Sequence, residues 1–274
     1  MAIVAISRQM GSGGYTIAAA VAKALNYEYV DRQMIIDAAR AFDVPEAKIA
    51  EVAERRPSVW QRFDDEKIRY RTFLDAAFFT IAERDNVVTA GRGIASLVRG
   101  IGHAVRVRII APFDVRVERI MKKEHLDHAK AAHKIREYDR YVTARISYLF
   151  GPEWLLPENY DVVINTLRDD PALYVDMVAG IASHPRFVAT PESTQQVRNL
   201  SLAAQVRAAI ARDPRTQSVA HLEVTADKGH VSLKGSVRHI SIREVATEVA
   251  REVPGVVGVS TEEVEIALYH TAAV

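Results

Sequence analysis

Cysteine is absent from the 274-residue sequence. Without thiols the chain cannot form disulfide bonds or thiolate metal sites, and it cannot use a cysteine nucleophile. Long uncharged hydrophobic runs are absent too, and the amino-terminus lacks the basic region, apolar core and cleavage site of a secretory leader. We therefore expect a soluble, cytoplasmic protein without a transmembrane segment.

A surplus of one charge sign is also missing, because 36 Lys and Arg residues balance 35 Asp and Glu residues and leave a net charge of +1. No global positive field marks the chain as a nucleic-acid binder, so we expect no nucleic-acid partner. Hydrophobic residues, in contrast, make up 49% of the chain. At this length they can form the core of one large domain or of two modest ones.

Short β-rich runs alternate with longer helical patterns in residues 1–183. The expected strands are residues 2–7, 86–90, 104–111 and 160–165, and the expected helices are residues 15–25, 64–84, 115–123, 127–150 and 171–183. This alternation predicts a three-layer α/β fold, in which helices cover both faces of a parallel sheet. Such sheets bind ligands beyond the carboxyl ends of their strands. The aromatic run FLDAAFF, residues 73–79, has helical spacing and is predicted to be core.

The pattern changes at residues 184–199, which are rich in Pro, Ser, Thr and Gln and lack apolar periodicity. We predict a linker there, between a first domain of residues 1–183 and a second of residues 200–268. The second domain is expected to contain a helix, two strands joined by an Asp-Lys-Gly turn, a helix and a last strand, at residues 200–212, 221–226, 230–236, 240–253 and 256–266. That order predicts a small α+β domain.

A glycine-rich stretch with Gly11, Gly13 and Gly14 joins the first strand to the first helix. Glycines allow backbone conformations that point successive N–H groups into one concavity, where an anion can bind. The helix that follows adds the positive end of its dipole, and Thr16 offers a hydroxyl for Mg²⁺. The alternative interpretation is a tight turn without a ligand.

This loop lacks the lysine of the common phosphate-binding form G-x-x-x-x-G-K-[ST]. When the two are aligned on Gly13, Gly14 takes the lysine position and Arg8 takes the position of the first glycine. A cation from elsewhere can replace the lysine, and Arg8 is the nearest candidate. We therefore predict a catalytic role for Arg8.

Several stretches of the first domain resemble the cytidylate kinase-like family. The first is ISRQMGSGGYTIAAAVAKALNYEYVDRQMI, and in that family the loop also lacks the lysine. The resemblance continues through VVTAGRGIASLV, RVRIIAPFDVRVERIMKKE, HKIREYDRYVTARISYLFGPEW and NYDVVINT, and it covers most of residues 1–182. It implies a P-loop NTPase-type fold and a phosphoryl transfer from ATP, with Mg²⁺, to a nucleoside monophosphate such as CMP or dCMP.

The resemblance implies roles for the loop and for two cations of a later helix. The donor phosphates would lie against the loop residues, with Thr16 at the metal; these residues are Gly11, Ser12, Gly13, Gly14, Tyr15 and Thr16. Arg119 would stack on the donor base. Lys123, one helical turn later, would reach the phosphates as a catalytic cation.

Other residues would bind the acceptor. Arg92, in the GRG that follows a strand, would grip the acceptor phosphate through its fork of donors and would assist catalysis. Asp31 matches an acidic position that lies near the acceptor nucleoside in monophosphate kinases. Both assignments are implied by the resemblance.

The stretch with Asp139, Arg140 and Arg145 resembles the return helix of a kinase lid. The resemblance implies that Asp139 and Arg140 bind substrate and that Arg145 is catalytic. Related sequences often carry an arginine three residues after that aspartate, where this chain has Val142. Which arginine reaches the phosphates therefore stays open.

The second domain resembles the BON domain family. It has the pattern G-x-V-x-L-x-G-x-V, which begins at Gly229, and a VPGV that follows the next helix. The stretch has no catalytic constellation. The resemblance implies a binding or regulatory module with a protein or phospholipid ligand.

Three functions stay open from the sequence alone. The first is a nucleoside monophosphate kinase, which the retained cations favour. The second is a nucleotide-binding regulatory protein with little kinase activity, and the third is a kinase of another small molecule; the missing lysine favours these two. The oligomeric state is not predicted.

Overall fold

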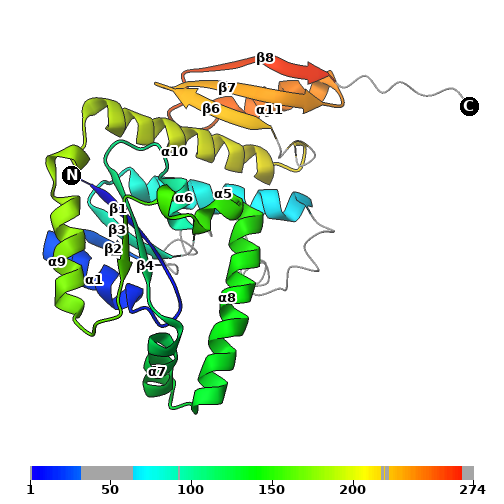
Figure 1. Cartoon of the computed structure of the whole chain (residues 1–274). Helices are drawn as coiled ribbons and strands as arrows, with labels where there is room; N and C mark the ends of the chain where they lie inside the picture. Colours follow the sequence, from blue (N-terminus) through cyan, green and yellow to red (C-terminus); the bar gives the residue numbers. More distant parts are fainter. Residues whose placement is uncertain (1, 32–63, 92, 217–218, 220–221, 267–274) are drawn as a thin grey trace, which may run out of the picture. The chain divides into compact units, whose positions relative to one another are not determined.

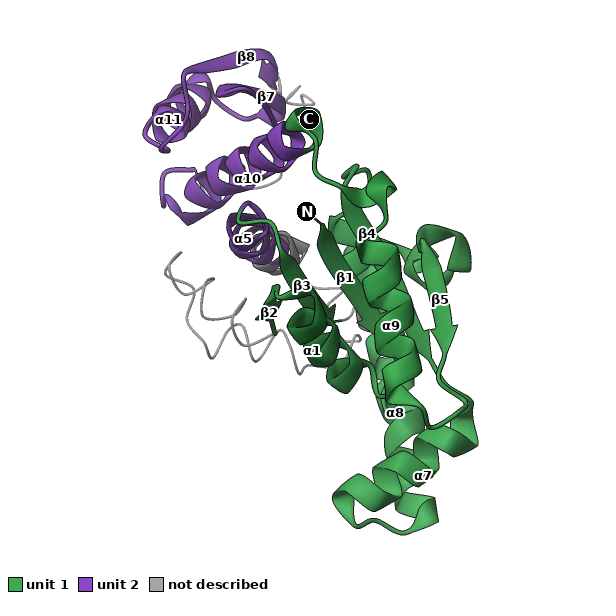
Figure 2. Ribbon diagram, turned by 90° about the vertical axis from the view of Figure 1, so that its left-hand side faces the viewer, with its two compact units in different colours: residues 1–34, 56–58, 84–193 green, residues 35–55, 59–83, 194–274 purple. Residues whose placement is uncertain are grey.

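A computed structural model describes residues 2–31, 64–91, 93–216, 219 and 222–266 (Figure 1). These residues form two compact units (Figure 2). The first unit contains the described residues up to 31 and those from 84 to 193, and the second contains those from 64 to 83 and from 194 onward. No helix in this described part is long and apolar enough to cross a membrane.

A five-stranded parallel sheet forms the centre of the first unit. Its strands are β1 (Ile3–Arg8), β2 (Glu28–Val30), β3 (Val87–Gly91), β4 (Ala104–Ile110) and β5 (Val162–Asn165), and their order is β2-β3-β1-β4-β5. Every pairing in this sheet is parallel, as predicted. Because β1 is the central strand, the loop that follows it lies in the middle of the carboxyl edge of the sheet. Folds of this kind bind their ligands at that edge.

Helices flank this sheet, and the pair α7–α8 extends beyond its carboxyl edge (Figure 1). The helices of the first unit are α1 (Gly14–Leu25), α6 (Ile94–Leu97), α7 (Phe113–Glu124), α8 (His128–Phe150) and α9 (Pro171–Ala182), with short 3-10 turns at Pro152–Leu155, Pro157–Asn159 and Pro185–Phe187. Val21 of α1 and Val178 of α9 are fully buried in one apolar cluster with Val4 and Val107 of the sheet. A smaller apolar cluster joins α7 to α8. The predicted α/β class is confirmed.

The second unit combines helices with a small sheet. Its elements are α5 (Asp64–Ala82), α10 (Pro191–Arg212, whose first three residues belong to the first unit), β6 (Glu223–Asp227), β7 (His230–Val237), α11 (Ile240–Arg251) and β8 (Gly258–Ile266). β6 and β7 form the predicted antiparallel hairpin, and β8 pairs with β7 in parallel after the crossover through α11. In α5, Phe73, Phe78 and Phe79 are buried, as predicted for the aromatic run. The expected α+β domain is confirmed.

The second half of the predicted linker is helical, which corrects that expectation. α10 begins at Pro191, so residues 191–199 form its first turns. The Thr190 N–H donates to Ser193 Oγ at 2.9 Å, and the Ser193 N–H donates to Thr190 Oγ1 at 3.2 Å. Proline is common at the first helical position, and reciprocal bonds of this kind cap helix starts. The stretch Thr-Pro-Glu-Ser therefore marks the start of a helix. The boundaries of the two domains stay predictions.

Ser193 also belongs to a buried chain of hydrogen bonds in the first unit. Its Oγ is 2.8 Å from Nδ1 of His103, and Nε2 of the same ring is 2.9 Å from Oδ1 of Asp85. The His103 side chain has no exposed surface. The first turn of α10 is therefore held by the first unit, although most of the helix belongs to the second.

Candidate functional site

The loop between β1 and α1 leaves backbone N–H groups available. Gly11 and Gly13 have φ angles of 76° and 77°, in the left-handed region that favours glycine. No side chain caps α1, and its first helical bond runs from the Ile17 N–H to the Gly13 carbonyl oxygen at 3.1 Å. The N–H groups of residues 14–16 have no acceptor among the described residues. Free N–H groups at the positive end of a helix form a site for a phosphate.

Contacts with the ends of β4 and β5 hold this loop in place. The Gln9 side-chain oxygen accepts a hydrogen bond of 3.1 Å from the Ala111 N–H, just after β4. The Ser12 hydroxyl is buried and donates to the Gln9 carbonyl oxygen at 2.8 Å. Thr166, which follows β5, donates from Oγ1 to the Ser12 carbonyl oxygen at 2.9 Å. The loop is therefore fixed by the sheet before any ligand binds.

An ion pair with a buried arginine supports the loop from the α7–α8 side. Arg116 Nη1 lies 2.7 Å from Asp139 Oδ2 and 3.4 Å from the Met10 carbonyl oxygen. The Arg116 side chain is only 7% exposed. The backbone of Arg116 also lies against Gly11, since a Cβ at Gly11 would be 2.9 Å from its carbonyl oxygen. Asp139, predicted to bind substrate, is thus the partner of an arginine that supports the phosphate loop.

Arg8, the last residue of β1, lies directly beside the loop. Its guanidinium carbon is 3.9 Å from the centroid of the Tyr15 ring, in the first turn of α1. Its Nε is buried and has no hydrogen-bond partner among the described residues. The stem of its side chain passes the place where a side chain at Gly14 would begin. The predicted cation therefore lies at the position of the missing lysine.

Arg119 is joined to the loop through Thr166. Its Nη1 donates to Thr166 Oγ1 at 3.0 Å, and its Nη2 donates to the Thr166 carbonyl oxygen at 2.8 Å. Thr166 also contacts Ser12 of the phosphate loop, so Thr166 links Arg119 to that loop. Lys123, one helical turn later, is exposed and has no ion-pair partner among the described residues.

Asp31 lies close to the loop as well. Burial raises the pKa of the Tyr29 hydroxyl, the neighbouring Tyr15 and Asp31 raise it further, and Arg8 lowers it. Charges exert such effects at short range, so Asp31, Tyr29, Tyr15 and Arg8 lie near one another at the ends of β1 and β2. Two other predicted residues cannot be placed: Arg92 and the side chain of Arg145 lie outside the described residues.

Two positions of α8 that the sequence singles out, Arg140 and Val142, lie in other surroundings. Arg140 is 79% exposed and forms an ion pair of 3.6 Å with Glu137 on the same helix. Val142, at the position of the family's lid arginine, is buried in an apolar cluster with Ile146 and Trp154. The face of α8 that carries Val142 is therefore apolar, and the described contacts do not bring Arg140 to the loop.

The residues of the loop fit a Mg²⁺ ion that arrives with a nucleotide. Thr16 is exposed in the first turn of α1, and its hydroxyl has no partner among the described residues. Within the same described ranges, no group of three or more His, Asp or Glu side chains could hold a metal ion. Mg²⁺ is commonly held by one or two protein oxygens together with phosphate oxygens. A single loop hydroxyl meets that requirement.

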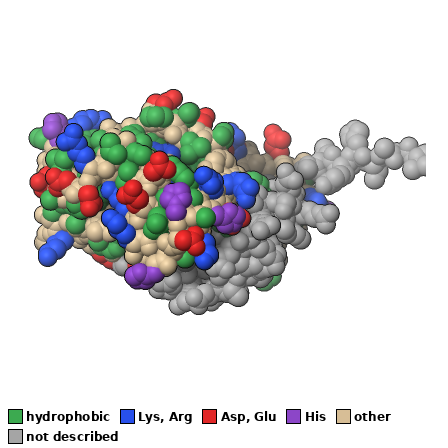
Figure 3. All heavy atoms as spheres, turned by 60° about the horizontal axis from the view of Figure 1, so that its bottom comes forward, with side chains coloured by type: hydrophobic (Ala, Val, Ile, Leu, Met, Phe, Trp, Pro, Cys, Tyr) green, Lys and Arg blue, Asp and Glu red, His purple; other side chains and the backbone are tan. Residues whose placement is uncertain are grey.

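The surface near α7 and α8 carries charges of both signs. Figure 3 shows Lys and Arg, Asp and Glu, and His side chains interspersed over the described part of this face. The described part of this face therefore carries no broad basic patch (Figure 3).

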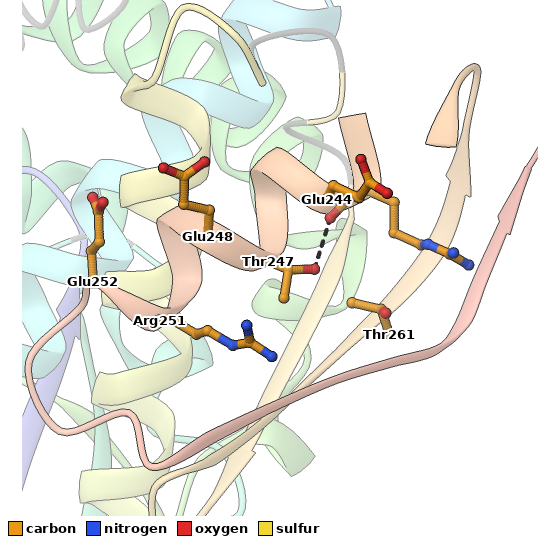
Figure 4. Close-up of a pocket in the computed structure, with 7 residues that line it drawn as sticks. Glu244, Thr247, Glu248, Arg251, Glu252 and Thr261 are labelled. Atoms are coloured by element: carbon orange, nitrogen blue, oxygen red, sulfur yellow. Dashed lines mark hydrogen bonds between the residues drawn. The ribbon is translucent and has the colours of Figure 1, made fainter. Parts of the chain in front are cut away.

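A second concavity lies in the other unit, between α11 and β8 (Figure 4). Its volume is about 480 Å³, and its lining carries charges of both signs: Arg243, Glu244, Thr247, Glu248, Arg251, Glu252 and Thr261. The Thr247 hydroxyl donates to the Arg243 carbonyl oxygen at 2.8 Å, so this hydroxyl is bonded within α11. This pocket has no nucleophile with a base beside it, and it is a candidate binding surface only.

Sequence reasoning missed two residues of the phosphate site, Arg116 and Thr166. Arg116 has a local signal, because it is spaced four residues from the buried Ile120 on α7. Thr166 has none, since its contacts depend on the position of β5 beside β4.

Comparisons with known proteins agree with the two resemblances. Residues 3–168 match the model of the cytidylate kinase-like family, and residues 200–267 match that of the BON domain. The cytidylate kinase of Haloarcula marismortui is 30% identical over 170 residues, which are 62% of this chain and 83% of that protein. The cytidylate kinase of Sulfolobus acidocaldarius is 26% identical over 181 residues, 66% of this chain and 93% of that protein.

A solved structure shares its fold with about two thirds of this chain. The crystal structure of an uncharacterized protein from Eubacterium ventriosum aligns with a TM-score of 0.51 and 19% sequence identity. The alignment covers 67% of this chain and 100% of that one. The shared fold therefore extends over that whole protein.

Proposed function

Because the chain belongs to the cytidylate kinase-like family, we propose that it transfers a phosphoryl group from ATP to a nucleoside monophosphate, CMP or dCMP. One observation carries the proposal: the loop after the central strand has three N–H groups without an acceptor among the described residues, with Arg8 beside them. The names of the two relatives support the choice of a cytidine nucleotide as the acceptor.

Phosphoryl transfer requires positioning and charge stabilisation more than covalent chemistry. The N–H groups of residues 14–16 bind and orient the donor phosphates, and Arg8 balances their charge. Arg119 contacts the donor base from the position that Thr166 gives it. Bound Mg²⁺ supplies neutralisation of charge on the phosphates, and Thr16 is the protein residue that holds it.

The acceptor is held by residues from other elements. Arg92, which follows β3, binds the acceptor phosphate, and Asp31, after β2, lies at the acceptor nucleoside. Lys123 and Arg145 provide further cations as ATP is converted to ADP, and Arg140 contacts substrate. Asp139 acts through Arg116, because the ion pair holds the loop at Met10.

Phosphorus NMR with Mg-ATP and a panel of nucleoside monophosphates tests this proposal, with a reaction that lacks an acceptor as the control. We expect ADP together with one diphosphate product. Arg92→Ala should raise the KM for the acceptor about tenfold or more, while the affinity for ATP stays unchanged. Absence of transfer to every acceptor, with ATP binding intact, would contradict the proposal.

A second function is favoured by Gly14, which stands where the common phosphate loop has a lysine, and by Val142, which stands where related sequences often carry an arginine. The chain would then be a nucleotide-binding regulatory protein, or a kinase of another small molecule. ATP binding without transfer to any nucleotide distinguishes both from the first proposal. Formation of ADP together with a phosphorylated form of another phosphate compound or alcohol would identify the last.

The BON domain serves as a binding or regulatory module for a protein or a phospholipid, and its pocket between α11 and β8 is the surface to test. Flotation of the chain with vesicles of anionic and of neutral phospholipid distinguishes the two ligand classes. We also propose that the protein acts in the cytoplasm, where ATP is supplied.

A further inference from the structure

The phosphate loop departs from the common form G-x-x-x-x-G-K-[ST] at three positions. Arg8 stands at the first glycine, Gly14 at the lysine, and Tyr15 at the serine or threonine, so the hydroxyl assigned to Mg²⁺, that of Thr16, lies one residue later than in the common loop. In the folded chain these three residues contact one another. The three departures from the common loop therefore depend on one another.

Gly14 is needed for space. It is absent from the residues with positive φ, so its backbone would accept other residues. A Cβ at this position, however, would lie 2.6 Å from Cβ and 3.2 Å from Cγ of Arg8. Non-bonded carbons do not approach so closely. A lysine at position 14 is therefore incompatible with the present conformation of the Arg8 side chain.

Tyr15 holds the other end of Arg8. The guanidinium carbon lies 3.9 Å from the ring centroid, within the range of a cation–π contact. Tyr15 is 38% exposed, so its ring lies at the open side of the loop. The stack directs the cation along the first turn of α1, where the N–H groups of residues 14–16 are free.

The Arg8 guanidinium has N–H donors without an acceptor among the described residues. Its Nε is buried without a hydrogen-bond partner, and the chain forms no ion pair with its guanidinium among the described residues. A buried donor without an acceptor is unfavourable, and an arriving phosphate oxygen would remove that cost. A guanidinium is always charged and can contact two phosphate oxygens at once, which a lysine does not do.

We propose that Arg8 is the phosphate-binding cation in place of the loop lysine, that Gly14 provides its space, and that Tyr15 is its positioning residue. This inference rests on the proposed nucleotide site. It assigns Arg8 to the outer phosphates of the donor, so its contribution should grow from AMP to ADP to ATP.

Calorimetric titration with ATP, ADP and AMP tests the assignment without any transfer step. Arg8→Gln should weaken ATP binding about 10- to 100-fold and AMP binding less than about threefold. Tyr15→Phe should bind ATP as the wild type does, because the ring remains, whereas Tyr15→Leu should weaken it about fivefold. Arg84→Gln, a change in an exposed arginine paired with Glu28, is the matched control and should leave all three affinities unchanged.

A double substitution tests the shared space. Gly14→Lys alone should reduce ATP affinity about tenfold or more, because the new side chain meets Arg8. Gly14→Lys together with Arg8→Gly should recover much of that loss, because the lysine then takes the place that Arg8 leaves. Additive losses in the double variant would contradict the coupling.

The two proposals fail in different ways. A wild-type chain that transfers no phosphoryl group but loses ATP affinity with Arg8→Gln would refute the kinase and keep the assignment of Arg8. Transfer by the wild type, with an unchanged ratio of ATP to AMP affinity in Arg8→Gln and Tyr15→Leu, would overturn the assignment and keep the kinase. Absence of ATP binding by the wild type would overturn it as well.

Discussion

We expect Asp75 to make the stability of the second unit depend on pH. It lies in α5 with a side chain only 7% exposed, and burial raises its pKa to about 6 although the charges of Arg71 and Arg207 lower it. One carboxylate oxygen is 3.5 Å from Nε of Arg71, and the other is buried without a hydrogen-bond partner. The charged form is therefore poorly compensated in the folded chain.

The sign of the effect follows from the raised pKa. Below about pH 4 the carboxyl group is protonated in both the folded and the unfolded chain, so folding carries no charge penalty. As the pH rises from about 4 to about 6, the unfolded chain releases the proton first, and the stability falls. Above pH 6 the loss is complete, and a shift of roughly two pKa units corresponds to about 3 kcal/mol.

The substitution Asp75→Asn removes this titration. An asparagine has nearly the shape of the protonated acid, so the variant should match the wild type near pH 4 and exceed its unfolding free energy by up to about 3 kcal/mol at pH 8. Urea unfolding followed by circular dichroism between pH 4 and pH 8 measures the difference. Asp176→Asn, which changes an exposed aspartate of α9, is the control for a change of net charge.

A difference between Asp75→Asn and wild type that stays constant across this pH range would refute the reasoning. So would a variant that is less stable than the wild type at pH 8. The first result would mean that Asp75 is not protonated on burial, and the second would mean that the ion pair with Arg71 outweighs the cost of burial.

Three other substitutions test the site. Gly11→Ala should cost about 1–2 kcal/mol and weaken ATP binding, because position 11 has a positive φ and lies against Arg116; thermal unfolding and calorimetry measure both effects. Thr166→Val should leave the Ser12 carbonyl oxygen without its donor, which costs about 1–3 kcal/mol, and a variant as stable as wild type would contradict that role. Val142→Arg should destabilise the chain by about 3 kcal/mol without improving kcat, because position 142 is buried among apolar side chains; faster turnover would show that a lid arginine can be restored there.

Most elements of both units could be predicted because their signals are local. The apolar strands separated by helical patterns predict the parallel sheet, and the Asp-Lys-Gly turn predicts the β6–β7 hairpin. The glycines of the phosphate loop follow β1 directly in the sequence, so the phosphate loop is also a local signal. The predicted start of α10, residue 200, was too late. Thr190, Pro191 and Ser193 are of types that are common both in linkers and at helix starts.

The remaining parts of the site depend on positions that are far apart in the chain. Thr166 lies 154 residues after Ser12 and meets it only because β5 and β1 end at the same edge of the sheet. Arg116 was missed because charged residues in helices are usually exposed. The stack of Arg8 on Tyr15 depends on the conformation of the Arg8 side chain beside Gly14. No sequence pattern predicts that conformation.

The way α10 begins has a practical consequence for separating the two units. A fragment that starts at residue 200 would lack the cap formed by Thr190 and Ser193 and would lack Val197, which is buried. A fragment that stops at residue 183 would lack Ser193 and would leave Nδ1 of the buried His103 without its partner. Residues 190–193 thus serve both the buried His103 and the start of α10, and two fragments that both keep these contacts have to overlap there.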